Sequence, residues 1–232
     1  MARAASTGKC FLCKGTFKRA AMTRHVGACL QERAASAERP AARPGKKAKC
    51  LHIWVEGRYL PQYWLYIEVP AKAKLSTLDQ FLRDIWLECC GHMSAFTIGE
   101  QMYSVEPMED YAEHDMNVAL SALLAPGTAF LYEYDFGTTT DLKLRILSEA
   151  EGKLQGNAIR LLARNHPPEI PCGKCGKPAT KVCPFCVHDA GGWLCNACAP
   201  KHKCEDDVFL PVVNSPRTGM CAYTGREAGE MA

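Results

Sequence analysis

The stretch that constrains this sequence most is PCGKCGKPATKVCPFCVHDAGGWLCNACAPKHKC, residues 171–204. It contains three Cys-x2-Cys pairs, followed by a histidine and one more cysteine. Two residues between paired cysteines allow both sulfurs to face one tetrahedral ion in a tight turn. The side chains of this pattern are Cys172, Cys175, Cys183, Cys186, Cys195, Cys198, His202 and Cys204. Eight protein ligands saturate two tetrahedral zinc ions, so we expect two structural sites with no position open for water.

The order of these ligands allows two pairings. In the sequential pairing, the first two cysteine pairs share one ion, and Cys195 and Cys198 share the other with His202 and Cys204. In the interleaved pairing, the first pair joins the third, and the second pair joins the histidine and the last cysteine. We favour the interleaved pairing, because a whole tetrahedron within residues 195–204 would be cramped. The ligand order is also similar to that of cross-braced modules such as the MYND type.

Further expectations concern two aromatic side chains, a spare histidine and the other cysteines of the chain. We expect Phe185 and Trp193 to pack between the two sites and make up their thin core. His188 is a spare ligand for the case that His202 does not bind. We expect the thiols outside the metal patterns to be free, and these are Cys50, Cys89, Cys90 and Cys221.

A second metal-ligand pattern lies in residues 1–31. Its spacing is Cys-x2-Cys-x11-His-x3-Cys, and the ligands are Cys10, Cys13, His25 and Cys29. His25 and Cys29 lie one helical turn apart, so they share a helix face. Phe17 and Met22 stand where a ββα finger places its small core. The pattern resembles a Cys-Cys-His-Cys variant of the Cys2His2 finger, whose folding would depend on metal. We therefore expect three zinc ions in all.

The cysteine spacing also bears on the compartment. The chain has 14 cysteines, and four of its pairs are Cys-x2-Cys. Lys9, Cys10 and Lys14 come too early for the apolar core of a signal peptide. This spacing without such a peptide predicts metal binding in the cytoplasm rather than disulfides. No run reaches the roughly 18 apolar residues of a membrane span, so no membrane partner is expected.

Charge is distributed unevenly along the chain. Residues 1–49 carry 12 Lys and Arg against 2 Glu, a net of +10, whereas residues 50–165 carry a net of −7. Residues 32–49 form a basic linker in which Pro40 and Pro44 interrupt any helix. Such a basic segment is typical of a polyanion contact, although a solubilising tether would have the same composition. The candidate nucleic-acid-binding residues are Lys14, Lys18, Arg19, Arg24, Arg43, Lys46 and Lys47.

Residues 50–165 have the pattern of an α+β domain. Alternating apolar residues predict strands, and a stripe from Leu78 to Trp86 predicts a helix that Ser76 or Thr77 could cap. The expected elements are strands at 51–55, 63–69, 130–136 and 141–147, a hairpin of 96–98 with 102–105, and a short helix at 118–124. The fold class is therefore α+β, with a sheet-and-helix domain between an N-terminal ββα finger and a two-zinc module at residues 166–232.

One motif of this domain carries a family resemblance. Tyr132-Glu133-Tyr134-Asp135-Phe136-Gly137, with the strand that follows it, resembles the core motif of the Ri-plasmid ORF-three-like family, also called insertion-sequence passenger TnpR-like. The resemblance covers residues 50–150, and the tail at 210–225 is similar to that of zinc-bearing members. Thr138 and Thr140 stand where many members have Asp and Trp. For Asp135 we expect bonds to backbone amides in a turn, and for Gly137 a positive φ.

These observations bear on three kinds of function. A nucleic-acid-associated protein, binding DNA or RNA, is favoured by the finger and its basic arm. A protein–protein adaptor is favoured by the rigid C-terminal module, which carries no net charge. Enzyme activity is not expected, because no nucleophile is set beside a base in the sequence, and no small-molecule substrate is indicated. We therefore expect a non-enzymatic zinc protein.

Overall fold

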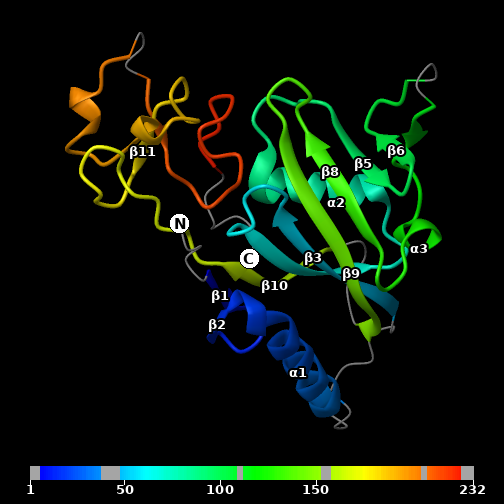
Figure 1. The fold of residues 1–232 in the computed structure, drawn as a ribbon. Coiled ribbons are helices and arrows are strands. Elements are labelled where there is room, and N and C mark those ends of the chain that lie inside the picture. Colours follow the sequence, from blue (N-terminus) through cyan, green and yellow to red (C-terminus); the bar gives the residue numbers. More distant parts are fainter. Residues whose placement is uncertain (1–5, 38–47, 109–111, 153–157, 205–207, 226–232) are drawn as a thin grey trace.

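The computed structural model describes residues 6–37, 48–108, 112–152, 158–204 and 208–225. They form a mixed α+β fold that is rich in strands and has few helices, which confirms the expected class. Figure 1 shows a large sheet, with β1, β2 and α1 below it and a smaller lobe built from the residues that follow β10. The candidate residues Arg43, Lys46 and Lys47 lie outside the described residues.

The large sheet has the strand order β2-β1-β10-β4-β3-β9-β8-β5-β6-β7, and only β6 and β7 are parallel. Its strands are β1 (Thr7–Cys10), β2 (Thr16–Lys18), β3 (Ala48–Gly57), β4 (Trp64–Pro70), β5 (Ser94–Ile98), β6 (Gln101–Ser104), β7 (His114–Asp115), β8 (Ala129–Tyr134), β9 (Thr140–Gly152) and β10 (Arg160–Asn165). The helices are α1 (Arg19–Ala37), α2 (Leu75–Leu82), the π-helical turn η1 (Arg83–Leu87) and α3 (Leu120–Leu123), with two short 3-10 turns in the lobe, η3 (Ala190–Gly192) and η4 (Ala199–Lys201). A three-stranded sheet in the lobe joins β11 (Lys181–Val182), β12 (Trp193–Leu194) and β13 (Leu210–Pro211).

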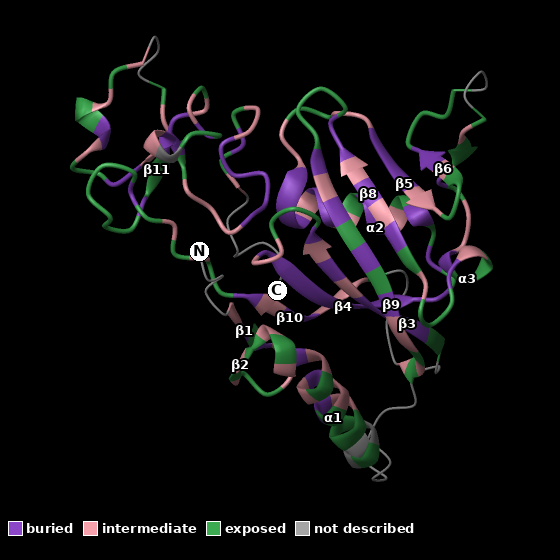
Figure 2. Cartoon of the chain, in the orientation of Figure 1, coloured by how far each residue is buried: buried purple, intermediate pink, exposed green. Residues whose placement is uncertain are grey.

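One face of the sheet carries the main core. Alternate residues of β3 and β4 point to this face because side chains of a strand alternate between its two sides. They meet the inner side of α2 and Trp86 of η1, and all of these side chains are buried (Figure 2). The predicted strands and the 96–98/102–105 hairpin are confirmed. The predicted helix cap is wrong, since α2 begins at Leu75 and its N-cap, Lys74, makes no side-chain capping bond.

The N-terminal ββα unit covers the part of the opposite face that β3, β4 and β10 form. The rings of Trp54 and Trp64 stack with centroids 4.9 Å apart, and Met22 and Val26 of α1 are buried in the same cluster as Trp64. Since β1 pairs with β10, and β10 with β4, the unit continues the large sheet as well as packing on it. The N-terminal ligands therefore stand on a framework that the core supplies.

The same face holds a buried row of polar side chains. His52 faces Ser148 of β9 at 2.9 Å and Glu68 of β4 at 3.2 Å, and Arg160 of β10 also binds Glu68. These contacts follow from strand register, because His52 is paired with Ser148 and with Glu68, and Arg160 is paired with Glu68. A buried carboxylate needs such partners to remain ionised. Burial by itself would raise the pKa of Glu68, but its bonds with His52 and Arg160 outweigh burial and hold the pKa below 4.5.

We predict that Glu68→Gln lowers the free energy of unfolding by about 1.5–3 kcal/mol at neutral pH, since it removes charge-assisted hydrogen bonds. The folded state binds the Glu68 proton less readily than the unfolded chain. Its contribution is therefore complete above the unfolded pKa and is lost as pH falls through the lower folded pKa. Urea unfolding at several pH values would measure both effects. The control is Glu149→Gln, at an exposed ion pair with Lys49, which should change little. Equal stability of the two variants at pH 7 would contradict the assignment.

Candidate metal centres

The N-terminal ligands come together as one group. β1 supplies Cys10, the turn after it supplies Cys13, and α1 supplies His25 and Cys29 on one face. The His25 Nε2 atom lies 3.2 Å from the Cys13 sulfur and 3.4 Å from the Cys29 sulfur. All four ligand atoms lie within 4.8 Å of one another, so the group could hold a metal ion. The Phe17 ring stacks on the His25 ring at 3.5 Å between centroids and fixes the imidazole in place.

The thiols of this group titrate differently because of their surroundings. A backbone N–H bond from Gly15 lowers the pKa of Cys13, whereas burial, with the neighbouring Cys13 thiol, raises the pKa of Cys29 to about 12. Thiolates placed this close repel one another, and a bound cation removes the repulsion. The donor set therefore suits a divalent ion that prefers sulfur and imidazole.

The eight C-terminal ligands fall into two groups, and the grouping is the interleaved one. Cys172 and Cys175 lie with Cys195 and Cys198, while the second group is Cys183, Cys186, His202 and Cys204. The sulfurs of Cys175 and Cys195 lie 3.6 Å apart in the first group, and those of Cys186 and Cys204 lie 3.9 Å apart in the second. The β11–β12 pairing places the ligand turns beside one another. Each group could hold one ion.

Amide bonds prepare part of this module for metal. The backbone N–H of Lys174 lowers the pKa of Cys172 to about 6, which favours the thiolate. Burial and the neighbouring Cys204 thiol raise the pKa of Cys186 to about 11. The thiolate is the metal-binding form, so the fold prepares Cys172 for metal, while Cys186 would release its proton to solvent when an ion binds.

Of the two aromatic side chains expected in the core of this module, Trp193 is packed and Phe185 is not. Trp193 packs against Val182 and Val187, and its indole N–H donates to the Val187 carbonyl at 3.1 Å. Phe185, in contrast, keeps 61% of its surface exposed and does not fill the space between the groups. Phe185 lies in the turn between Cys183 and Cys186, whose sulfurs join the same ligand group. His188 belongs to neither group among the described residues.

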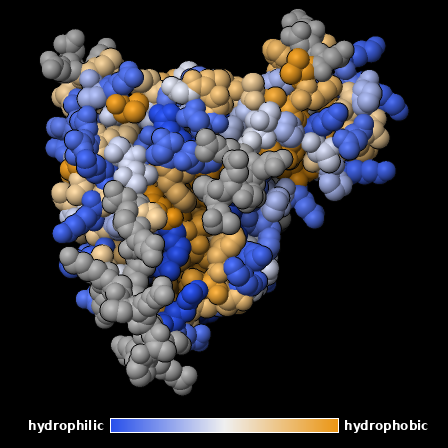
Figure 3. Space-filling model, turned by 180° about the vertical axis from the view of Figure 1, so that it is seen from behind, coloured by the Kyte–Doolittle hydropathy of each residue, from blue (hydrophilic) through white to orange (hydrophobic). Residues whose placement is uncertain are grey.

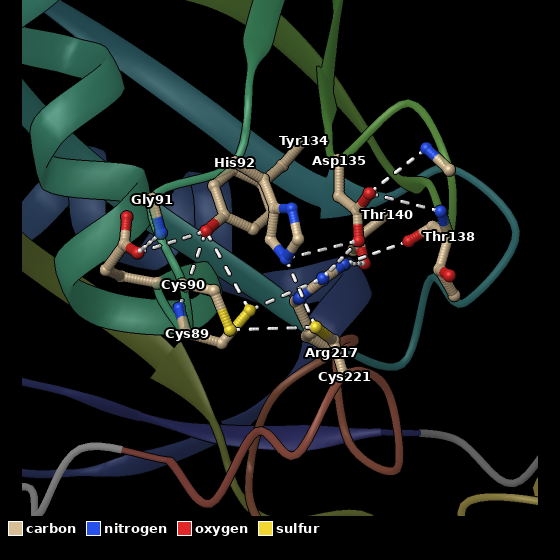
Figure 4. Close-up of polar contacts among 12 residues, drawn as sticks. Cys89, Cys90, Gly91, His92, Tyr134, Asp135, Thr138, Thr140, Arg217 and Cys221 are labelled. Carbon is tan, nitrogen blue, oxygen red and sulfur yellow. Dashed lines mark hydrogen bonds and ion pairs between the residues drawn. The ribbon is translucent and has the colours of Figure 1, made fainter.

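A fourth group assembles from residues that we expected to be free thiols. Cys89 and Cys90, His92 and the distant Cys221 place their ligand atoms within 4.8 Å of one another (Figure 4). Local spacing could not reveal this group, because 129 residues separate His92 from Cys221. Cys50 does stay outside every group of the described residues and bonds weakly to the Ala48 carbonyl.

The Asp135 turn holds the C-terminal tail. Asp135 has a φ of +66° and its Oδ1 accepts bonds from the amides of Gly137 and Thr138 at 3.0 and 3.2 Å, as expected for this carboxylate. The expected positive φ at Gly137 is wrong, since Asp135 itself takes the left-handed conformation. Oδ2 accepts from Arg217 at 2.6 Å. Burial would raise the pKa of Asp135, but Arg217 and the two amides hold it below its usual value.

Arg217 is completely buried and satisfies several elements at once. Besides Asp135 it donates to the Thr138 carbonyl at 2.9 Å and to the Thr140 hydroxyl at 3.1 Å. Its guanidinium also lies 4.8 Å from the centre of the Tyr134 ring. The two threonines that depart from the common family pattern are therefore contacts of this arginine.

The candidate nucleic-acid-binding residues fall into three situations. Lys14, Lys18 and Arg24 are exposed on the N-terminal unit. Arg19 is half-buried, forms an ion pair with Glu56 and lies over the Trp54 ring, so it holds the unit to the sheet. As noted above, the three cations of the linker lie outside the described residues.

The fold and the candidate sites therefore define a strand-rich α+β protein with four Cys/His groups among the described residues. A family model of the plasmid pRiA4b ORF-3-like proteins matches residues 50–176, and the chain belongs to this family. A crystal structure of a protein of unknown function, MM3350 from Methanosarcina mazei Go1, is similar at 18% identity and a TM-score of 0.45. The similar region covers 50% of this chain and 70% of the Methanosarcina mazei chain. No curated protein matches the chain. No helix of the described residues has the length and apolar character needed to cross a membrane.

We predict that Arg217→Met lowers the free energy of unfolding by about 3–5 kcal/mol, because it leaves the Asp135 carboxylate buried without its cation. Arg217→Lys should recover only part of this loss, since an ammonium cannot reach the same set of acceptors. Urea unfolding followed by circular dichroism measures the change. Arg145→Met, at an exposed position of β9, is the matched control. An Arg217 variant as stable as this control would contradict the stabilising role of the Arg217–Asp135 pair.

Proposed function

We propose that this chain is a non-enzymatic, cytoplasmic zinc protein that associates with nucleic acid through its N-terminal unit, which acts as a Cys-Cys-His-Cys finger. The observation that carries the proposal is the split between the two sides of α1. Met22 and Val26 of α1 face the sheet, whereas Arg24 of α1 is exposed, as is Lys18 at the end of β2 directly before the helix. Counted from the start of α1 at Arg19, these cations occupy positions −1 and 6, where fingers contact DNA.

The donor sets support zinc as the ion. Each of the three groups that the sequence spacing identifies offers only cysteine and histidine ligands. Three or four of the four ligand atoms in each group are sulfur. Sulfur-rich tetrahedral sites select zinc over the hard cations that prefer oxygen. Four protein ligands leave no place for a reactive water, so these ions would stabilise structure.

The same geometry supports contact with phosphates more than choice of sequence. Position 3 of the helix is Ala21, which offers no hydrogen bond to a base edge. One finger reads about three base pairs, and only its outer two positions here carry cations. The acidic body, with its net charge of −7, would repel a polyanion and confine contact to the basic N-terminal part. We therefore propose salt-sensitive binding with little sequence preference.

The row of Ser148, His52 and Glu68 does not lead us to propose an enzyme. A hydroxyl, an imidazole and a carboxylate in line resemble a hydrolase triad in composition. Strand register accounts for all three contacts, however, and Glu68 is engaged by Arg160 as well. The imidazole is almost fully buried, so a substrate would have no access to it. The row is better explained as a satisfied polar network of the sheet.

One observation favours an adaptor as a second candidate. Phe185 and Val208 expose 61% and 56% of their surface in the C-terminal lobe. Figure 3 shows hydrophobic atoms among hydrophilic ones on that lobe, at the upper right of the view from behind. Exposed aromatic side chains on a rigid support are typical anchors of protein interfaces. This candidate would need no nucleic acid.

The test is fluorescence anisotropy with zinc-loaded, full-length protein and labelled duplex DNA, single-stranded DNA and RNA. We predict that Lys18→Ala/Arg24→Ala weakens binding and makes the dependence of log affinity on log salt less steep by about 2. Lys143→Ala/Arg145→Ala removes two exposed cations of β9 and is the matched control.

We expect only Lys18→Ala/Arg24→Ala to bind the nucleic-acid probes more weakly than the wild type does. If both double variants bind as tightly as the wild type, the finger face is not the contact surface. If the wild type binds no probe at low salt, the nucleic-acid proposal fails and the adaptor becomes the leading function. Pull-down with Phe185→Ala as the comparison would then follow.

A further inference from the structure

We propose that Cys89, Cys90, His92 and Cys221 form a fourth zinc site, which fastens the C-terminal tail to the family core. The proposal does not depend on nucleic-acid binding. It concerns four residues that belong to none of the spacing patterns of the sequence. The ligands are three thiols and one imidazole, the same donor set as that of the N-terminal group.

The distances within the group fit a tetrahedron around one ion. The sulfurs of Cys90 and Cys221 are 3.7 Å apart, and the His92 Nε2 atom lies 3.1 Å from the Cys221 sulfur. With zinc–sulfur bonds of about 2.3 Å, the sulfur–sulfur edge of a tetrahedron is about 3.8 Å. The corresponding nitrogen–sulfur distances of the N-terminal group are 3.2 and 3.4 Å. The fourth group therefore has the dimensions of the groups that the sequence identifies as metal sites.

The same distances do not fit a disulfide. A disulfide brings its sulfurs to about 2.05 Å, far closer than Cys90 and Cys221 lie. Three sulfurs and a ring nitrogen also converge on one point, which pairing of two sulfurs would not require. Figure 4 shows these atoms facing one another across the space between the loop of Cys89 and the tail.

The core side of the site is delivered by a sharp turn. η1 ends at Leu87, and π-helical turns occur often at functional sites. Gly91 then takes a φ of +71°, and its amide donates to Glu88 at 2.6 Å. This reversal sends Cys89, Cys90 and His92 toward the same point. The Cys89 amide also donates to the Tyr134 hydroxyl at 3.4 Å, which ties the turn to β8.

The tail side is delivered by an unusual backbone. Cys221 and Ala222 both have positive φ, at +43° and +55°. Such conformations are costly for residues other than glycine and persist where surrounding contacts hold them. Ser215 anchors the same tail through a bond to the Trp86 carbonyl at 2.6 Å. The tail is therefore held to the core at Ser215, six residues before Cys221.

The charges around the group suit a bound ion. One zinc with three thiolates has a net charge of −1, and the three thiol protons would pass to solvent on binding. Arg217 donates to the Cys89 sulfur at 3.5 Å and so offsets this charge without binding the ion itself. Asp135 accepts the same guanidinium, and its Oδ2 lies 3.7 Å from His92 Nε2, the nitrogen that would bind the ion. The family motif thus positions the site through Arg217.

The site would be the most accessible of the four. None of its ligands is buried, whereas each of the other groups has at least one buried cysteine. Its ion would also close a chain loop of about 130 residues, and closing a long loop restricts the unfolded chain most. We expect this zinc to be released first by a chelator, together with loosening of the tail.

The experiment measures zinc per chain in full-length protein, purified and dialysed under reducing, metal-buffered conditions. The wild type should hold one zinc more than Cys221→Ser and one more than His92→Ala. Cys50→Ser, a buried thiol outside the groups, should lose none, and His92→Cys should keep the zinc because it restores a ligand. Circular dichroism would establish that each variant is folded, and Cys90→Ser offers a milder change at an exposed position.

A second measurement separates a zinc site from other uses of the thiols. In cobalt-loaded protein, His92→Cys should strengthen the sulfur-to-cobalt absorption, since a fourth sulfur replaces nitrogen. The proposal is overturned if Cys221→Ser and Cys90→Ser, both folded, hold as much zinc as the wild type. It is equally overturned if mass spectrometry finds Cys90 joined to Cys221 by a disulfide in protein kept under reducing conditions.

Discussion

The pairing of β10 with β1 on one side and β4 on the other is the constraint on which the rest of the structure depends. Through it the N-terminal unit becomes part of the central sheet. β10 also leads directly into the C-terminal lobe, and its last residue, Asn165, bonds to Asn214 of the tail at 2.7 Å. All three parts of the chain therefore meet at one six-residue strand.

This arrangement changes how the N-terminal unit is understood. A finger that folds alone has only its metal and a few apolar residues to stabilise it. Here Trp64 and Tyr66 of the sheet share a buried cluster with Met22 and Val26. Arg19, a cation of the basic segment, contributes to this docking rather than to the surface. Because α1 packs against the sheet, only a narrow strip of its surface can contact other molecules.

Features that depend on residues close together in the sequence could be predicted from it. The alternation in β3 and β4 and the ligand spacing at 172–204 describe neighbours along the chain, and the structure places them as their spacing suggests. What escaped prediction depends on contacts between distant segments. β10 has no clear alternation, and its pairing on both sides decides its conformation. Cys221 meets His92 only because Arg217 and Ser215 bring the tail to the core.

The two ends of the large sheet have a consequence for self-association. A ten-stranded open sheet exposes unpaired backbone groups at its margins, where a strand from another copy could add. Here the margins are β2, of three residues, and β7, of two, and both carry charged or ionisable side chains. So short an edge offers few amides and carbonyls to a second chain. Strand addition by a second copy would therefore form few backbone hydrogen bonds at either margin of the described sheet.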